Sequence, residues 1–572
     1  DHVVLNPANL QDVVGHIAFA SAESVAEAIS TAEIASTEWG GLSADQRALC
    51  LEKAADVLED EMQPLMGLII REAGKSYANA VAEIREAVDF LRYYAARSRE
   101  VFSEPTSKPL GVVACISPWN FPLAIFLGQV AAALAAGNVV LAKPAEETPL
   151  IAQEAVRILH EAGVPKFAVQ LVAGAGNVGA QLVRDPRVAG VLFTGSTEVA
   201  RLIQKQLADR LNPDGTPVPL IAETGGQNAL IVDSSALSEQ VVADTLSSAF
   251  DSAGQRCSAL RLLCLQEESA DRVLTMLKGA MTELSTGNPQ LLSTDIGPVI
   301  SSEAQAGILR HIEEMRAKGY RVYQAPLSAG CEEGMFVPPT LIEIPSIAVL
   351  KQEIFGPVLH VVRYPRAGLD RLMDDINATG YALTFGVHTR IDRTIARVTE
   401  RTHAGNVYVN RNLVGAVVGV QPFGGHGLSG TGPKAGGPLY LRRLLAVSPP
   451  LPMSLCQPLP SIMSIYTAWM REREVRPSAP ALTSTPLGTE LTLPGPVGEK
   501  NLYSLLPRGN VFCAGGSAAS LLSQAAAALA TGNRVLVLPE MFDAFPNLPA
   551  PLSEWIRPFD LAGHIDFARC SL

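Results

Sequence analysis

Residues 111–144 have the sequence GVVACISPWNFPLAIFLGQVAAALAAGNVVLAKP. The β-branched run Gly111–Ile116 predicts a buried strand, the alanine-rich Leu123–Ala136 predicts a helix, and Val139–Leu141 predicts a second strand. The same alternation continues downstream, with strands expected at Ala168–Val172 and Val188–Phe193 and helices at Leu150–Ala162, Val178–Arg184 and Thr197–Leu207. Strands that alternate with helices predict an α/β fold, a parallel sheet with helices on both faces.

The flanking sequence extends this picture in both directions. Upstream, Glu23–Ala35 and Ala44–Glu59 carry apolar residues at helical spacing. Downstream, a second α/β unit is expected from about residue 240 to 405, with strands at Leu260–Leu265, Val358–Val362 and Thr384–His388. Residues 449–497 are rich in Pro, Ser, Thr and Leu, which favours a linker with one helix near residues 462–473.

Composition excludes several classes of protein. The chain has 572 residues, 48% of them hydrophobic, and a net charge of −12, which argues against a nucleic-acid partner. Its eight cysteines show no metal-ligand spacing, so we expect reduced thiols in a cytoplasmic protein and no metal site. No long apolar run or signal peptide is evident. Because the chain lacks an initial Met, we expect it to be part of a longer polypeptide.

The C-terminal region repeats part of the first α/β unit. Gln129–Pro144 aligns without a gap to Gln524–Pro539, and eleven of the 16 positions are identical. The strand Gly111–Ile116 corresponds more loosely to Gly509–Ala514. Leu538 replaces Lys143, and no Trp-Asn pair occurs in the repeat. The repeat therefore keeps the residues that form the fold and loses the polar ones.

Two residues suggest covalent chemistry. Cys257 lies among small and polar residues, and Glu223 precedes it by 34 positions. A cysteine with a carboxylate available as base suits attack on a carbonyl carbon. Considered without its neighbours, Cys257 could equally be a small apolar residue that packs in the core.

A series of motifs supports the reactive cysteine. Residues 5–445 resemble the NAD(P)-dependent aldehyde dehydrogenase superfamily, on motifs that occur in the order of that family: Ser117–Pro122, Lys143–Glu146, Phe193–Glu198, Glu223–Gly226, Gly254–Cys257 and Glu353–Pro357. The resemblance implies an aldehyde dehydrogenase fold in consecutive parts. These are a Rossmann-type NAD-binding domain at 1–239, an α/β catalytic domain at 240–430, a return and oligomerisation segment at 431–448, the linker at 449–497, and a truncated, degenerate Rossmann-like repeat at 498–572.

The resemblance also implies a mechanism. Cys257 would attack the aldehyde, and the side-chain amide of Asn120 together with the backbone N–H of Cys257 would hold the resulting oxyanion. Glu223 would act as the general base that activates water to hydrolyse the thioester. If these were merely structural residues, Asn120 would be a turn residue and Glu223 a helix-capping acid.

Cofactor binding requires a choice between two glycine-rich segments. Gly174–Gly179 matches GxGxxG literally. The resemblance instead assigns the pyrophosphate to Ser196 and Trp119 and makes Gly174–Gly179 a turn near the adenosine. A carboxylate at Glu146 favours NAD over NADP. The cofactor-binding residues implied for NAD are Ser117, Trp119, Lys143, Glu146, Gly195, Ser196, Gly225, Glu353 and Phe355.

The substrate is implied by a narrower resemblance. Ser258 and the glycine-rich residues 412–425 and 430–438 resemble the L-glutamate γ-semialdehyde dehydrogenase branch, in particular that domain of bacterial proline utilization A proteins. Ser258, Gly415 and Ala416 would then anchor the α-carboxylate. Phe121 and Phe423 would pack against the aliphatic chain, and Glu83 would face the α-ammonium group.

The expected activity is therefore NAD-dependent oxidation of L-glutamate γ-semialdehyde to L-glutamate, the second step of proline catabolism. Two alternatives stay open: a dehydrogenase of another carboxylated semialdehyde, such as succinic semialdehyde, and a non-catalytic scaffold of the same fold. The resemblance implies an FAD-dependent proline dehydrogenase domain in the parent polypeptide. It leaves open whether the chain forms a homo-oligomer.

Overall fold

The computed structural model describes residues 2–102, 107–473 and 482–559. The chain divides into two compact units, one that ends at Pro449 and one that begins at Pro450. Among the helices in these ranges, none is both long and apolar enough to cross a membrane.

The first sheet confirms the alternation expected from residues 111–144. Its five parallel strands lie in the order β6-β5-β4-β7-β8. The chain runs outward from the central β4 through β5 and β6, then returns to the other side of β4, and such a switch creates a crevice at the carboxyl ends of the strands. The strands are β4 (Val112–Ile116), β5 (Val139–Lys143), β6 (Val169–Leu171), β7 (Val188–Thr194) and β8 (Leu220–Glu223).

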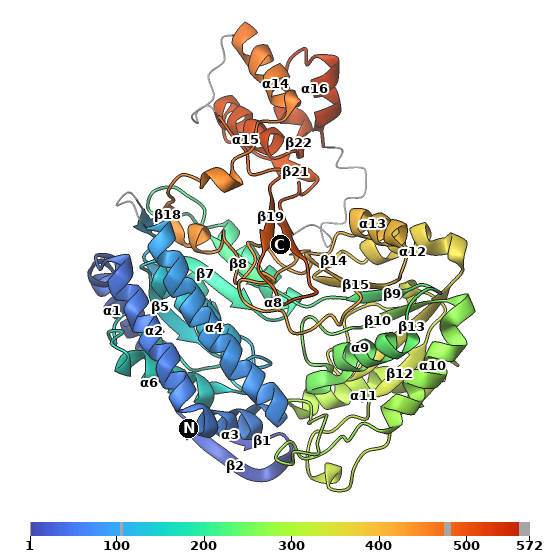
Figure 1. Cartoon of the computed structure of the whole chain (residues 1–572). Helices are drawn as coiled ribbons and strands as arrows, with labels where there is room; N and C mark the ends of the chain where they lie inside the picture. The colour runs from blue at the N-terminus through green and yellow to red at the C-terminus, as the bar shows by residue number, and fades with distance from the viewer. Residues whose placement is uncertain (1, 103–106, 474–481, 560–572) are drawn as a thin grey trace. The chain divides into compact units, whose positions relative to one another are not determined.

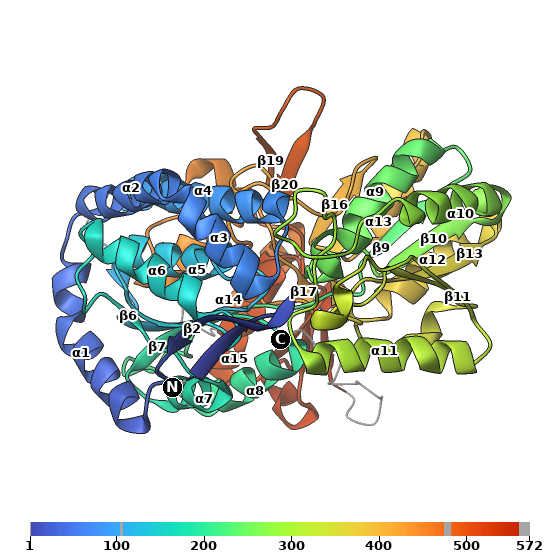
Figure 2. The same ribbon diagram turned by 90° about the horizontal axis from the view of Figure 1, so that it is seen from below.

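Helices cover this sheet and pack into one apolar core with it. Those that connect the strands are α5 (Ala124–Ala135), α6 (Pro149–Glu161), α7 (Gly176–Arg184) and α8 (Thr197–Ala208). The N-terminal elements are the hairpin β1 (His2–Asn6) and β2 (Asn9–Ile17), followed by α1 (Ala22–Gly40), α2 (Ala44–Asp60), α3 (Met62–Ala73) and α4 (Tyr77–Val101). Figure 2 shows α2, α3 and α4 on the same side of this sheet as α5 and α6.

The second sheet has seven strands in the order β11-β12-β13-β10-β9-β15-β16, all parallel except the pair β11–β12. The strands are β9 (Ala229–Val232), β10 (Leu262–Gln266), β11 (Arg321–Gln324), β12 (Thr340–Glu343), β13 (Val358–Tyr364), β15 (Thr384–His388) and β16 (Asn406–Val409). Figure 1 shows α9 (Ser238–Phe250) and α10 (Glu267–Thr282) on one face and α12 (Leu369–Asn377) and α13 (Asp392–Arg401) on the other.

The change from one sheet to the other comes earlier than the sequence indicated. β8 ends at Glu223 and β9, already in the second sheet, begins at Ala229. The boundary expected at residue 239 therefore does not match the sheets. A four-residue apolar run such as Ala229–Val232 carries no signal that tells which sheet it joins.

The second unit has a small core of its own. A parallel sheet of β21 (Asn510–Cys513), β22 (Arg534–Val537) and β23 (Ile556–Pro558) packs with α14 (Ser461–Glu472), α15 (Ala518–Ala530) and α16 (Ala550–Trp555). α14 contributes the buried Tyr466 and Trp469 to this core. The helix is where we expected it, but the linker expected at 449–497 is wrong for α14, which packs in this core, and for β19 (Glu490–Leu493), which pairs with β20 (Asn501–Ser504).

The repeat extends to individual hydrogen bonds. In the first unit, the backbone N–H of Gly111 donates to Oδ1 of Asn138 at 3.0 Å, and in the second unit Gly509 donates to Asn533 at 3.0 Å. The glycine before each asparagine has a positive φ, 87° and 72° respectively, and ends its helix. The two segments thus form the same strand, helix, turn and strand.

Candidate active site

Cys257 lies in a loop of unusual backbone shape. The loop follows the 3₁₀ helix η1 (Asp251–Gly254) and precedes β10. Ser252 and Ala253 have φ of 55° and 53°, a backbone conformation that residues other than glycine rarely adopt. A Cβ at Gly254 would lie 2.2 Å from the carbonyl oxygen of Gly356, so only glycine fits. The surrounding structure therefore holds the nucleophile loop in one conformation.

The structure brings most of the predicted catalytic and substrate residues together. One pocket is lined by Cys257, Glu223, Ser258, Gly415, Ala416, Phe121 and Phe423. The two aromatic rings, with Phe90 and Tyr440 beside them, make much of the wall apolar. The pocket thus offers a cysteine, a carboxylate and polar groups within an apolar cavity, an arrangement typical of a small-molecule site.

The electrostatic surroundings of Cys257 favour the protonated thiol. Burial raises its pKa to about 12, and the carboxylates of Glu353 and Glu223 add to the rise. Because the thiolate is the nucleophile, the proton must leave before or during attack. The site therefore needs a proton acceptor.

Glu223 is suited to accept protons near neutral pH. It ends β8, and its Oε2 accepts a hydrogen bond of 3.2 Å from the backbone N–H of Gly425. Its Oε1 is buried without a partner among the described residues. Burial raises the pKa of Glu223 to about 8, against the opposing effects of the Gly425 N–H and the cation of Lys434. A carboxylate with one free oxygen and such a pKa can act as a general base.

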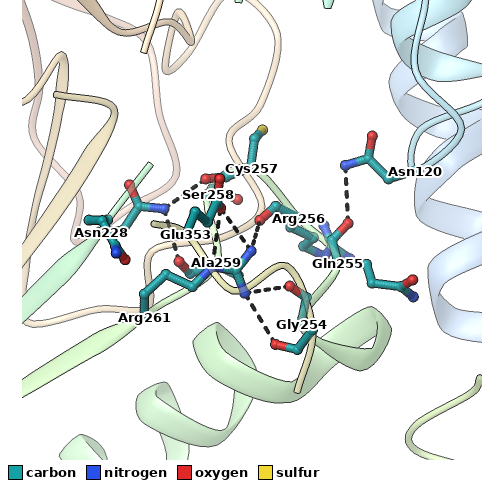
Figure 3. Close-up of polar contacts among 12 residues, drawn as sticks. Asn120, Asn228, Gly254, Gln255, Arg256, Cys257, Ser258, Ala259, Arg261 and Glu353 are labelled. Atoms are coloured by element: carbon teal, nitrogen blue, oxygen red, sulfur yellow. Dashed lines mark hydrogen bonds and ion pairs between the residues drawn. The ribbon is translucent and has the colours of Figure 1, made fainter. Parts of the chain in front are cut away.

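Asn120 is fixed against the nucleophile loop. The side-chain amide of Asn120 donates to the backbone carbonyl oxygen of Gln255 at 3.0 Å (Figure 3). The backbone carbonyl oxygen of Asn120 accepts a hydrogen bond from Nζ of Lys75 at 2.5 Å. Lys75 also donates to Oγ of Ser252 at 2.9 Å. The buried Lys75, which sequence reasoning missed, therefore ties the Asn120 loop to the segment before Cys257.

Several predicted cofactor residues meet in a second pocket. Trp119, Glu353 and Phe355 line it, and the rings of Trp119 and Phe355 meet edge to face at 5.6 Å between centroids. A Cβ at Gly225 would lie 1.8 Å from Oε2 of Glu353, so only glycine admits that carboxylate. The buried Oγ of Ser117 has no partner in the described structure. Such an orphaned hydroxyl fits a ligand that supplies the missing hydrogen bond.

The other cofactor candidates lie at the carboxyl ends of β5 and β7. Lys143 ends β5 with Nζ 3.8 Å from Glu146, and the aliphatic part of Lys143 lies 3.4 Å from the position of a Cβ at Gly179. Gly195 donates its N–H to the carbonyl oxygen of Glu223, and Ser196 caps the N-terminus of α8. Both strand ends border the crevice at the switch point beside β4, where nucleotides bind in such sheets.

Glu83 does not occupy the predicted position. Its Oε1 accepts hydrogen bonds of 3.0 Å from the backbone N–H groups of Leu123 and Ala124, and the side chain is buried. It caps α5, whose N-terminus has no side-chain cap of its own. Glu86, three positions later on α4, lines the substrate pocket instead. The assignment of Glu83 to the substrate ammonium group is therefore wrong.

Two further polar residues support the loops around the site. The side-chain amide of Asn228 donates to the carbonyl oxygens of Cys257 and Ala259 at 2.7 and 2.9 Å (Figure 3). Nζ of Lys434 donates to the carbonyl oxygen of Gly424 at 2.9 Å, next to the N–H that binds Glu223. Lys434 lies within the glycine-rich segment 430–438 and Asn228 lies two residues after the motif Glu223–Gly226, but only the fold reveals their partners.

Two α/β sheets within the first unit, with a cysteine and a half-buried glutamate lining one pocket, define the class of protein. The sequence profile described as the aldehyde dehydrogenase family matches residues 2–448. The chain belongs to the aldehyde dehydrogenase family.

Similarity to curated proteins is strong. The chain is 56% identical to the bifunctional protein PutA of Klebsiella aerogenes, over 97% of this chain and 44% of that protein. It is 37% identical to the 1-pyrroline-5-carboxylate dehydrogenase of Geobacillus kaustophilus, over 77% of this chain and 87% of that protein. The chain thus spans less than half the length of its bifunctional relatives.

Solved structures give the same picture. A crystal structure of bifunctional proline utilization A matches with a TM-score of 0.73 and 51% identity, covering 76% of this chain and 45% of that one. A 1-pyrroline-5-carboxylate dehydrogenase from Thermus, solved with bound NAD, matches with a TM-score of 0.72 and 36% identity, covering 77% of this chain and 88% of that one.

Proposed function

We propose that the first unit oxidises L-glutamate γ-semialdehyde to L-glutamate with NAD⁺, the second step of proline catabolism. The observation that carries the proposal is the shared pocket of Cys257, Glu223, Ser258, Gly415 and Ala416. A cysteine thiol and a carboxylate line one cavity together with a hydroxyl and a glycine-rich loop, which supports their proposed roles as nucleophile and base. The similarity to 1-pyrroline-5-carboxylate dehydrogenases supports the same substrate.

Catalysis begins when the Cys257 thiol releases its proton to solvent water and its Sγ attacks the aldehyde carbon, whose carbonyl π bond breaks to give the oxyanion of a thiohemiacetal. The oxyanion accepts hydrogen bonds from the Asn120 amide and the backbone N–H of Cys257, and a single donor of this kind is worth about 10²–10³ in rate. When bound, NAD⁺ would accept hydride from the former aldehyde carbon, which would leave a thioester on Cys257. Glu223 then takes a proton from water, which attacks the thioester and releases the acid.

The substrate is held at its far end. The hydroxyl of Ser258 and the backbone N–H groups of Gly415 and Ala416 bind the α-carboxylate, while Phe121 and Phe423 pack against the methylene chain. Glu86, rather than Glu83, faces the α-ammonium group. Burial raises the pKa of Glu86 to about 8, and a cation beside it would lower that pKa again and restore the carboxylate.

The residues at the two strand ends and in the second pocket fit NAD. Lys143 and Glu146 would hold the adenine ribose, Ser196 and Trp119 the pyrophosphate, and Glu353 and Phe355 the nicotinamide riboside. The orphaned hydroxyl of Ser117 is consistent with a ligand in this crevice. Because Glu146 would repel a 2′-phosphate, NAD⁺ is preferred over NADP⁺.

The second unit is proposed to have no catalytic role of its own. It repeats the strand, helix and strand but has Leu538 in place of Lys143 and lacks an equivalent of Asn120. We expect it neither to bind NAD⁺ nor to catalyse. The bifunctional relatives support a proline dehydrogenase domain in the parent polypeptide. That FAD binds to that domain stays a prediction. A location in the cytoplasm and assembly into a homo-oligomer stay predictions.

The test is NADH formation by the 572-residue chain with L-glutamate γ-semialdehyde and with succinic semialdehyde as separate substrates. We expect a higher kcat/KM for the first, and no turnover by the C257A variant with either. A higher kcat/KM for succinic semialdehyde would overturn the assignment of the substrate. A fully active C257A variant would overturn the mechanism.

A further inference from the structure

Arg261 is a buried charged residue close to the nucleophile loop, and the mechanism above does not use it. Its side chain is only 1% exposed, and it lies directly before β10, four positions after the nucleophile. Figure 3 shows its guanidinium between Glu353 and the backbone of residues 254–256. A buried guanidinium must satisfy its donors, so its partners indicate what it holds in place.

On the cofactor side, Arg261 contacts both residues proposed for the nicotinamide riboside. Its Nε and Nη2 donate to Oε1 of Glu353 at 3.2 and 3.0 Å. Its guanidinium carbon lies 5.1 Å from the centre of the Phe355 ring, within the range of a cation–π interaction. The Glu353 carboxylate, drawn to this cation, is therefore fixed in the second pocket.

On the nucleophile side, Arg261 binds the peptide groups that lead to Cys257. Nη1 donates to the carbonyl oxygen of Gly254 at 2.6 Å, and Nη2 donates to that of Arg256 at 3.1 Å. The second of these carbonyls belongs to the peptide whose N–H is that of Cys257, the proposed oxyanion donor. The direction of that peptide depends on the bond to Arg261.

The planar guanidinium explains why arginine stands here. It presents five donors in a rigid fork, so one side chain can bind a carboxylate and two carbonyls at once. A lysine has a flexible stem and a compact ammonium group, and cannot reproduce these directions. A shift of Glu353 therefore changes the bonds that hold the nucleophile loop.

We propose that Arg261 is a positioning residue that couples Glu353 to the peptide before Cys257, so that cofactor binding and nucleophile geometry depend on one set of hydrogen bonds. The proposal rests on the function proposed above, since it takes Glu353 as a cofactor contact and Cys257 as the nucleophile. The coupling predicts that NAD⁺ changes the reactivity of Cys257, and that this change depends on Arg261.

The decisive readout is the rate at which iodoacetamide alkylates Cys257, measured with and without NAD⁺ by mass spectrometry of the 572-residue chain. In the unsubstituted protein we expect NAD⁺ to change this rate at least about fivefold, in line with ordinary coupling energies. In R261M the ratio of the alkylation rates with and without NAD⁺ should be close to one. R261K should restore part of the effect of NAD⁺. A ratio of one in the unsubstituted protein, or an unchanged ratio in folded R261M, overturns the proposal.

Kinetics and a matched control complete the test. R261M should lower kcat by about 10–100-fold and also raise the KM for NAD⁺, because it loses charge-assisted hydrogen bonds on both sides. R261M and E353Q should be non-additive in kcat/KM for NAD⁺. R363K is the control, since Arg363 also pairs with two carboxylates, Asp271 and Glu343, and should leave every value unchanged. Loss of thermal stability alone, or additive effects, would contradict the coupling.

These measurements separate the two proposals. If the chain does not oxidise the semialdehyde, the proposed function fails, but alkylation of Cys257 and its dependence on NAD⁺ still report on Arg261. If the chain is active and R261M keeps the alkylation ratio, only the coupling fails.

Discussion

Glu223 accepts one hydrogen bond from the backbone N–H of Gly425 through Oε2, while Oε1 is buried without a partner among the described residues. The bond fixes the direction of the carboxylate, and the free oxygen is available to a water molecule. Because burial raises the pKa of Glu223 to about 8, this arrangement makes its protonation sensitive to pH in the neutral range.

The first prediction concerns the pH dependence of turnover. A raised pKa means that Glu223 is protonated, and inactive as a base, below about pH 8. Hydrolysis of the thioester should therefore slow as the pH falls through 8. The test is a pH profile of kcat, measured under conditions in which hydrolysis of the thioester limits the rate. A profile flat from pH 6 to about 9 would argue against Glu223 as the base.

The second prediction concerns E223Q. Loss of a general base slows the step it assists by about 10²–10⁴-fold. The variant should still form the thioester, so that rapid-mixing experiments show one equivalent of NADH per site followed by slow turnover. A variant with neither burst nor turnover would place Glu223 in the first half of the reaction instead.

The third prediction separates Glu83 from Glu86. E83A removes the acceptor for two buried N–H groups at the start of α5 and should lower the free energy of unfolding by about 1–3 kcal/mol. E86A should leave stability nearly unchanged and raise the KM for the semialdehyde. Thermal unfolding and steady-state kinetics distinguish them, and the opposite pattern would restore Glu83 as the substrate contact.

The fourth prediction concerns the carboxylate anchor. S258A removes a hydrogen bond to a charged group, which is worth about 1.5–3 kcal/mol, and should lower kcat/KM for L-glutamate γ-semialdehyde by about 10–100-fold. An aldehyde without a carboxylate, such as propionaldehyde, serves as the control and should react equally with both proteins. An equal loss for both aldehydes would mean that Ser258 acts on Cys257 rather than on the substrate.

Local patterns in the sequence were sufficient to predict the core of the fold. β4, α5 and β5 lie where the alternation of residues 111–144 placed them, because buried strands and alanine-rich helices depend on short-range composition. The boundary near residue 239 and the linker at 449–497 could not be predicted in the same way. Which sheet β9 joins, and whether α14 packs in a core, depend on contacts with distant residues.

The site shows the same limit at the level of single side chains. Cys257, Glu223 and Ser258 were found from motifs, and the fold brings them into one pocket. Glu83 and Glu86 lie three positions apart on one helix, so the pattern alone cannot tell which faces the pocket and which caps α5. The bonds of Arg261 to Glu353 span 92 positions and leave no local signal in the sequence.

The most direct test of the proposed function is a crystal structure of the chain with L-glutamate and NAD⁺ bound. We expect the α-carboxylate of glutamate to contact the Ser258 hydroxyl and the backbone N–H groups of Gly415 and Ala416, with the γ-carboxylate at Cys257 and Asn120. A glutamate bound in the reverse direction, or outside this pocket, would contradict it.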